Sequence, residues 1–227
     1  MPNHLILFDF DGTLADTAPD LAAAANRQRQ YRDLPPLPYE DLRPHASQGA
    51  RGLLRAALGM MPEDPEYAAT RQRFLDDYAQ AMLVHTCLFP GVETLLDRLA
   101  RQTLAWGIVT NKVESLALPI VRHLALDTRC TVTVGGDTTP YTKPHPEPLL
   151  HAARQAGVSP ERCIYIGDDA RDIQAGKAAG MATVAAAYGY CSLDDPARWD
   201  ADAIALSPAD LWPIIERWAV RDRIRQP

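Results

Sequence analysis

The chain contains a series of short, continuously apolar runs, each followed by polar residues and a helix-like stretch. The runs lie at 5–8, 104–110, 131–136, 163–167 and 182–187. The helix-like stretches lie near 91–101, 114–125, 146–157, 170–180 and 208–219. Continuous rather than alternating apolarity is typical of parallel strands that are covered on both faces. A strand followed by a helix, repeated along the chain, therefore predicts an α/β fold with a doubly wound parallel sheet.

Residues 15–88 interrupt this alternation, because they have helical patterning and no convincing strand. The turns "LPPLP" and "MPEDP" divide the segment, and Pro90 stands at the expected start of the helix that returns to the sheet. We therefore predict two units. Residues 1–14 and 89–227 form an α/β core, and residues 15–88 form an inserted helical segment.

Composition and charge argue against several classes of binding partner and cellular location. Hydrophobic residues make up 47% of the 227 residues, enough for a substantial core, and the net charge is -6. Because no basic face is available, no nucleic-acid partner is expected. No apolar run approaches the roughly 20 residues of a membrane helix, and the start lacks a signal-peptide pattern. The scattered cysteines form no CxxC pair, which argues against a zinc site and favours a cytoplasmic location.

The candidates for chemistry are polar residues just after the apolar runs, together with a lysine held in a turn. Ligands of doubly wound sheets collect at the carboxyl ends of the strands, where these residues stand. In chain order the candidates are Asp9, Asp11, Gly12, Thr110, Asn111, Lys143, Asp168, Asp169 and Asp172.

Several carboxylates at one sheet edge repel one another and raise one another's pKa values unless a cation neutralises them. Mg²⁺ prefers oxygen ligands and commonly takes one or two carboxylates together with substrate phosphate oxygens. Asp9 and Asp11 cannot have the same chemical role, because side-chain directions alternate at a strand end and the chain turns sharply at Gly12. One carboxylate can attack a phosphate ester while the other moves protons.

Four segments, in this order, resemble the four motifs of the haloacid dehalogenase superfamily: "DFDGT", "VTN", "TKPHP" and "GDDARD". The resemblance extends over essentially the whole chain. It implies a Rossmann-like core with an inserted α-helical cap that closes over the active site. It also implies a Mg²⁺-dependent phosphoric monoester hydrolase that forms an aspartyl-phosphate.

The resemblance implies a role for each motif residue. Asp9 resembles the nucleophile, and Asp11 resembles the general acid and base. The residues expected to bind the phosphoryl group are Gly12, Thr110, Asn111 and Lys143.

The same resemblance implies a metal site. Mg²⁺ is expected on Asp9, on the backbone carbonyl of Asp11 and on Asp168. Asp169 and Asp172 are expected to orient these ligands.

Other reactions of the superfamily fit the sequence less well. Dehalogenases lack the second aspartate of the first motif, whereas Asp11 is present here. Phosphonate-cleaving relatives need a lysine in the cap, but the lysines of this chain are Lys112, Lys143 and Lys177. Sugar-phosphate mutases carry a histidine where this chain has Leu21. Hydrolysis of a phosphate ester is the reaction that remains.

The segments "TLADTAPDLAAAAN" and "GDDARDIQAGKAAGMATV" resemble phosphoglycolate phosphatases, and the cap segment "RPHASQGARGLL" resembles N-acetylmuramic acid 6-phosphate phosphatases. Both substrates carry a carboxylate besides the phosphate, so arginine on the inner face of the cap is chemically suitable. The cap candidates are Arg43, His45, Gln48 and Arg51.

Three alternatives stay open at this point: a nucleotide phosphatase, a sugar-phosphate phosphatase and a non-catalytic metabolite sensor. The expected partner is a small phosphate ester, and the chain is expected to be a monomer or a homodimer.

Overall fold

The core of the protein is a parallel sheet, seen in a computed structural model that describes residues 3–224. Its strands are β1 (Leu5–Phe8), β4 (Ala105–Val109), β5 (Val132–Val134), β6 (Cys163–Gly167), β7 (Ala182–Ala186) and β8 (Ala203–Ala205). They lie in the order β5-β4-β1-β6-β7-β8, and each neighbouring pair is parallel. β4 and β5 lie on one side of β1, whereas β6, β7 and β8, which come later in the chain, lie on the other side. This order creates a topological switch point between β1 and β6.

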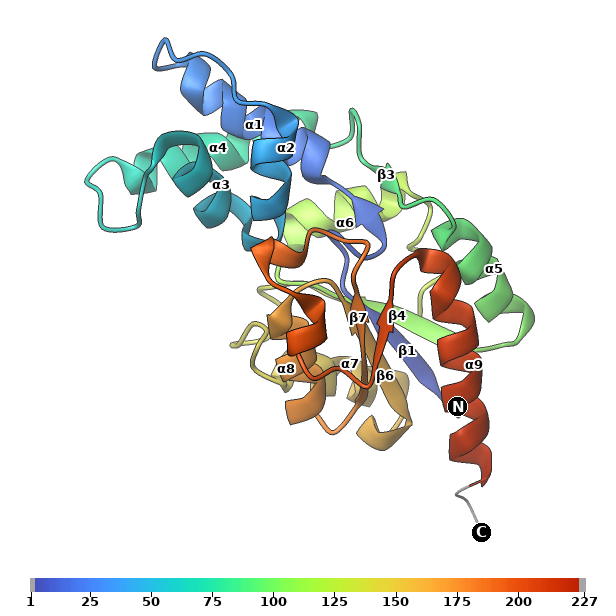
Figure 1. Cartoon of the computed structure of the whole chain (residues 1–227). Helices are drawn as coiled ribbons and strands as arrows, with labels where there is room; N and C mark the ends of the chain where they lie inside the picture. Colours follow the sequence, from blue (N-terminus) through green and yellow to red (C-terminus); the bar gives the residue numbers. More distant parts are fainter. Residues whose placement is uncertain (1–2, 225–227) are drawn as a thin grey trace.

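Helices cover both faces of the sheet (Figure 1). They are α5 (Val92–Arg101), α6 (Glu114–His123), α7 (Glu147–Ala156), α8 (Ala170–Ala178) and α9 (Leu211–Ile224). Alternate side chains of β1 point to opposite faces, so Leu5 and Leu7 pack with α7 and α8, whereas Ile6 and Phe8 belong to the core that includes α5 and α9. Burial on both faces explains why these strands read as continuous apolar runs.

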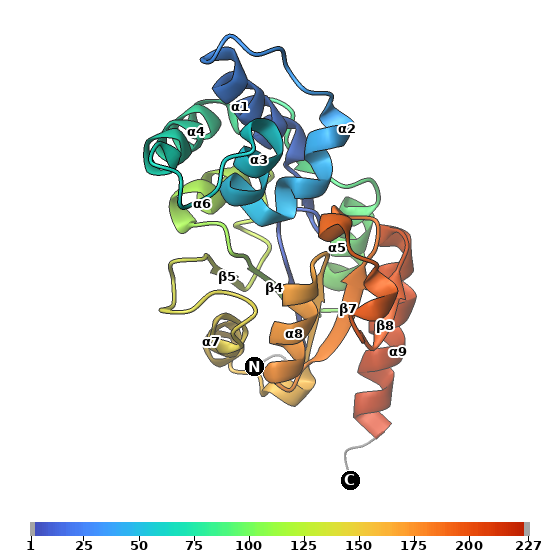
Figure 2. The same ribbon diagram turned by 60° about the vertical axis from the view of Figure 1, so that its left-hand side comes forward.

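A helical segment leaves the core after β1 and returns before α5. It consists of α1 (Ala18–Gln30), α2 (Tyr39–Leu42), a 3₁₀ helix (Arg43–Gln48), α3 (Gly49–Leu58) and α4 (Tyr67–Ala81). At its base, β2 (Ala15–Asp16) and β3 (Cys87–Leu88) form a short antiparallel pair. Residues 17–86 between these strands are called the cap from here on. The cap stands over one end of the sheet (Figures 1 and 2).

The predicted fold class is confirmed, and the main predicted strands and helices are found close to their expected positions. The sequence interpretation missed β8, whose three residues "AIA" are too short to stand out as an apolar run. It also missed the short 3₁₀ helices of the core at Pro160–Arg162, Cys191–Leu193, Pro196–Arg198 and Pro208–Asp210.

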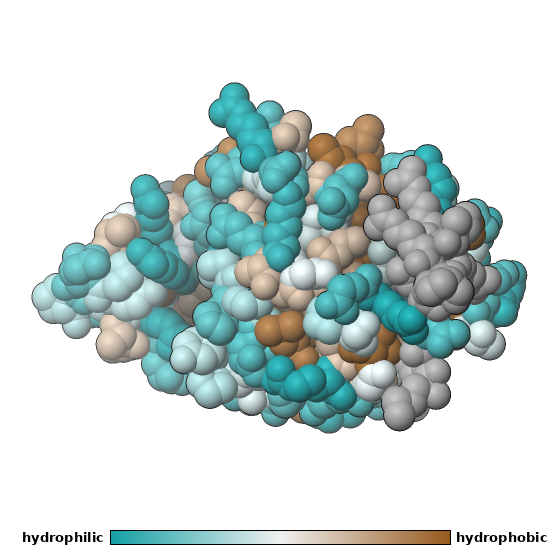
Figure 3. All heavy atoms as spheres, turned by 90° about the horizontal axis from the view of Figure 1, so that it is seen from below, coloured by the Kyte–Doolittle hydropathy of each residue, from teal (hydrophilic) through white to brown (hydrophobic). Residues whose placement is uncertain are grey.

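No helix in the described residues is both long enough and apolar enough to cross a bilayer. The face drawn in Figure 3 is mostly hydrophilic, with hydrophobic side chains in small separate patches.

Gly12 allows the chain to turn directly against the end of β6. Its φ is +82°, a conformation that L side chains rarely adopt. A Cβ at this position would lie 2.1 Å from Oδ2 of Asp168. Gly189 approaches Asp168 from another side, where an added Cβ would lie 2.3 Å from the Cβ of Asp168. Both glycines therefore let the backbone pack closely around one buried carboxylate.

We expect Gly12→Ala to destabilise the fold more than Gly180→Ala. Gly180 also has a positive φ, +74°, but has no atom within 4 Å of an added Cβ, so its substitution isolates the backbone strain. That strain costs about 1–2 kcal/mol, and the clash with Asp168 adds roughly 1–3 kcal/mol. Urea denaturation of both variants measures the difference. Equal losses of free energy would show that the close approach to Asp168 is unimportant.

Candidate active site

The switch point of the sheet brings together acids that are far apart in the sequence. Asp9 directly follows β1, and its N–H donates to the carbonyl of Ile166 in β6 over 2.8 Å. Asp168 directly follows β6, and Asp172 lies one turn into α8. Neighbouring parallel strands that end at the same level thus place Asp9 and Asp168 side by side.

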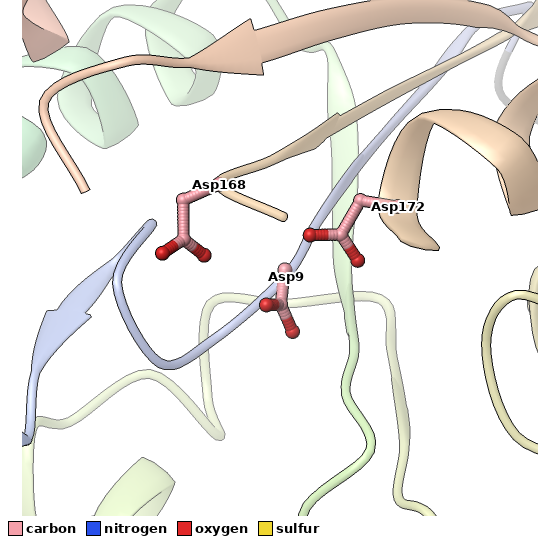
Figure 4. Close-up of side chains that lie close together, drawn as sticks. All are labelled: Asp9, Asp168 and Asp172. Carbon is pink, nitrogen blue, oxygen red and sulfur yellow. The ribbon is translucent and has the colours of Figure 1, made fainter. Parts of the chain in front are cut away.

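The carboxylates of Asp9, Asp168 and Asp172 form a compact cluster. Each offers an oxygen that lies within 4.8 Å of an oxygen of the other two. Figure 4 shows the three side chains close together. All are buried, with 8%, 0% and 1% of their surface exposed.

Lys143 supplies positive charge to this cluster. Its Nζ lies 2.7 Å from Oδ1 of Asp9 and 2.7 Å from Oδ1 of Asp172, and it donates to the hydroxyl of Tyr165 over 2.8 Å. Asn111 fixes the backbone of Lys143, because its carboxamide accepts from the lysine N–H over 2.9 Å and donates to the lysine carbonyl over 3.0 Å. Burial disfavours the ammonium group, but Asp172 and Asp9 raise the pKa of Lys143, so it stays charged.

One lysine does not neutralise three buried carboxylates. Burial raises the pKa of Asp9 to about 7; Lys143 opposes this rise and Asp172 adds to it. Burial, together with Asp9 and Asp172, raises the pKa of Asp168 well above its usual value. The raised pKa values show that Lys143 alone supplies too little positive charge for three carboxylates, which hold protons when no other cation is bound. Their hard oxygen donors fit Mg²⁺, whose charge would take the place of those protons.

Asp172 and Asp169 form the start of α8. The N–H of Asp169 donates to Oδ2 of Asp172 over 3.0 Å, and the Asp169 carboxylate accepts from the N–H of Asp172, which makes a capping box. The Asp169 carboxylate also accepts from the N–H of Arg171 over 3.0 Å. Both oxygens of Asp172 thus already have donors, since Lys143 contacts the other one.

Asp168 is held by donors from the core and the cap. Its Oδ2 accepts from the N–H of Tyr190 over 2.8 Å and from the hydroxyl of Ser47, a cap residue, over 3.1 Å. Its Oδ1 accepts from the hydroxyl of Thr13 over 3.3 Å.

Asp11 lies at the boundary between core and cap, apart from the carboxylate cluster. Its Oδ1 accepts from the hydroxyl of Thr17 over 2.5 Å and pairs with Nζ of Lys112 over 2.6 Å. Nζ of Lys112 also donates to the hydroxyl of Tyr78, on α4, over 2.8 Å. Burial disfavours the Lys112 ammonium, but Asp11 and Tyr78 raise the pKa of this lysine, so it stays charged.

A cavity of about 240 Å³ lies between the cap and the core. Of the motif residues, its wall contains Asp9, Asp11, Thr110, Asn111, Lys143, Asp169 and Asp172. The buried hydroxyl of Thr110 accepts from the N–H of Lys112 over 3.2 Å. The wall therefore joins the carboxylate cluster to a space large enough for a small molecule.

The cap candidates differ in their positions. Gln48 is part of the cavity wall, whereas Arg43, His45 and Arg51 are not among the lining residues. Arg43 lies over the ring of Tyr190, 5.0 Å from its centroid, and contacts the core there.

Several residues of the site were missed by the sequence interpretation. They are Ser47, Arg71, Tyr78, Lys112, Tyr165 and Arg171. A signal existed for two of them: Lys112 directly follows the "VTN" motif, and Arg171 lies inside "GDDARD". Ser47, Arg71 and Tyr78 lie in the cap, where nothing in the local sequence shows which residues face the core.

Comparison with known proteins gives consistent matches. Residues 6–186 match the family model "Haloacid dehalogenase-like hydrolase". A phosphoglycolate phosphatase of Xanthomonas campestris is 45% identical, over 91% of this chain and 94% of that protein. An N-acetylmuramic acid 6-phosphate phosphatase of Pseudomonas aeruginosa is 42% identical, over 93% of this chain and 94% of that protein. The crystal structure of a predicted phosphoglycolate phosphatase from Haemophilus somnus superposes with a TM-score of 0.83 at 29% identity, covering 94% and 98% of the two chains.

The raised pKa of Asp9 leads to a prediction about the metal-free protein. The pKa of Asp9 in the folded state, about 7, lies above its ordinary value of 3.8, so the folded state holds a proton that the unfolded chain releases. The stabilising contribution of Asp9 to the free energy of unfolding is therefore fully present below about pH 4 and is lost as the pH rises to about 7. Asp9→Asn removes this dependence. In EDTA, we expect the stability of the variant relative to wild type to increase by roughly 2 kcal/mol between pH 5 and pH 8.

Urea denaturation at the two pH values measures this change. A relative stability that stays constant, or falls with pH, would contradict the assignment of a raised pKa to Asp9.

Proposed function

The chain belongs to the haloacid dehalogenase-like hydrolase family, and on that premise we propose that it is a Mg²⁺-dependent phosphomonoesterase for a small acidic metabolite. The observation that carries the proposal is the buried cluster of Asp9, Asp168 and Asp172 beside Lys143, of which Asp9, Asp172 and Lys143 lie in the wall of a cavity. Burying so many carboxylates is costly unless the site also binds cations.

Asp9 is the proposed nucleophile. Lys143 holds Oδ1 of this carboxylate over 2.7 Å, which fixes the side chain at the cavity wall. In the first step, a carboxylate oxygen of Asp9 bonds to phosphorus as the bond from phosphorus to the ester oxygen breaks. In the second step, a water oxygen bonds to phosphorus, and the bond from phosphorus to Asp9 breaks to release inorganic phosphate.

Asp11 is the proposed acid and base. It donates a proton to the leaving alcohol in the first step and takes a proton from the water in the second. Thr17 and Lys112 fix its carboxylate at the boundary between core and cap.

The phosphoryl oxygens are proposed to contact Thr110, the backbone around Gly12, and Lys143. Thr110 and Lys143 lie in the cavity wall. The Asn111 carboxamide holds the backbone of Lys143 in place, which supports a positioning role for this side chain rather than direct phosphate binding.

The proposed Mg²⁺ ligands are Asp9, Asp168 and the backbone carbonyl of Asp11. Asp172 would orient the site, since its two oxygens are already engaged by Lys143 and the N–H of Asp169. When bound, the ion would neutralise the crowded carboxylates and offset charge on the phosphoryl oxygens.

The cap is proposed to close the site and select the substrate. Ser47 and Tyr78 bring cap side chains to Asp168 and Lys112, and such closure excludes water from the reacting groups. The names of the relatives support two candidate substrates, 2-phosphoglycolate and N-acetylmuramic acid 6-phosphate.

We expect Asp9→Asn to lower phosphate release by about 10⁴-fold or more, because the amide cannot attack phosphorus. Release of inorganic phosphate from p-nitrophenyl phosphate and from both candidate substrates measures the effect. Asp97→Asn, on the exposed surface of α5, is the matched control and should keep wild-type turnover. Near-normal turnover by Asp9→Asn would show that the nucleophile is misassigned, and phosphate binding without release by wild type would favour a sensor.

We also expect Asp168→Asn to raise the Mg²⁺ concentration needed for half-maximal activity by about tenfold or more. The variant loses a negative ligand oxygen but keeps its shape. A Mg²⁺ titration of the rate, started from protein treated with EDTA, measures the shift. Activity that is indifferent to EDTA, or an unchanged titration midpoint, would refute the proposed metal site.

A further inference from the structure

Four cationic residues line the cavity, and only one of them lacks an acidic partner in the described part of the chain. Lys112 pairs with Asp11, Lys143 with Asp9 and Asp172, and Arg171 with Asp169. The side chain of Arg71 has no hydrogen-bond or ion-pair partner among the described residues. Its guanidinium is therefore free to bind an anion in the cavity.

Arg71 belongs to a stripe on α4 that faces the cavity. Arg71, Phe74, Leu75 and Tyr78 are spaced three, four and seven residues apart, and all of them line the cavity. Tyr78 is at the end of the stripe that lies near the proposed reacting groups, because its hydroxyl contacts Lys112, which pairs with Asp11. The Cα of Arg71 is seven residues away, or about 10 Å along the helix axis.

Apolar side chains also line the cavity. Phe74 and Leu75 lie between Arg71 and Tyr78 on α4, and Leu21 of α1 and Leu116 of α6 belong to the same wall. Such side chains contact methyl groups or the C–H face of a sugar ring favourably, because this contact removes apolar surface from water.

A two-carbon phospho-acid does not match this spacing. Its phosphorus and carboxyl carbon are separated by three single bonds, a span of about 4 Å. With its phosphate at Asp9, its carboxylate would remain among the paired cations and would leave both the apolar side chains and Arg71 unused.

On the basis of the proposed function, we propose that Arg71 binds a substrate carboxylate remote from the phosphate, and that the substrate is a phosphorylated sugar acid with apolar substituents. A planar guanidinium suits a carboxylate, since it donates two parallel hydrogen bonds. Gln48, in the same cavity wall, adds an amide for neutral polar groups of the sugar. Arg71 is thus a specificity-determining residue supplied by the cap.

The test compares three phosphate esters. N-acetylmuramic acid 6-phosphate carries the remote carboxylate, N-acetylglucosamine 6-phosphate has the same sugar without it, and 2-phosphoglycolate is the short acid. Wild type should have a kcat/KM for N-acetylmuramic acid 6-phosphate at least tenfold higher than for either of the others. Arg71→Gln should raise KM for that substrate about tenfold, keep kcat within about twofold, and leave N-acetylglucosamine 6-phosphate unaffected.

Arg71→Lys should restore part of the loss, because it keeps the charge without the planar donor pair. The matched control is Arg73→Gln. Arg73 is on the same helix but lies over the ring of Tyr31, 5.3 Å from its centroid, and is not among the lining residues. We expect this variant to behave like wild type with all three esters.

Two results would overturn the proposal. One is an equal effect of Arg71→Gln on both sugar phosphates, and the other is a wild-type preference for 2-phosphoglycolate. Failure of the proposed function itself looks different: wild type then releases no phosphate from these esters or from p-nitrophenyl phosphate with Mg²⁺ present.

Discussion

The repulsion between buried carboxylates at one sheet edge is the constraint on which the site depends. Asp9 and Asp168 meet because β1 and β6 are neighbours that end at the same level. Lys143 offsets part of their charge, and Asn111 fixes its backbone. The charge that remains fits the proposed divalent ion, so the crowding of these acids and the proposed chemistry have the same cause.

The cap takes part in this arrangement through polar contacts at its boundary with the core. Ser47 donates to Asp168, Arg171 donates to the backbone carbonyl of Ser47 over 2.7 Å, and Tyr78 accepts from Lys112. Each contact links a cap residue to a core residue next to the carboxylates. Movement of the cap would therefore change the surroundings of Asp11 and Asp168 together, which couples substrate enclosure to the reacting groups.

The core and its motif residues could be predicted from sequence, because strand ends, turns and acids are local features. The predictions of the family, the fold class and a phosphoric monoester hydrolase are confirmed. The cap could be predicted only as helical. The sequence does not show which arginine faces the cavity, since that depends on how α4 packs over the core. Arg43, chosen for its neighbours in the sequence, instead packs on Tyr190, whereas Arg71 lines the cavity.

A crystal structure of the wild-type protein grown with Mg²⁺ tests the central claim most directly. We expect one ion with a carboxylate oxygen of Asp9 and one of Asp168 at about 2.1 Å. Lys143 should still contact Asp9 in that structure. An ion bound elsewhere, or carboxylates of Asp9 and Asp168 too far apart to share it, would contradict the account.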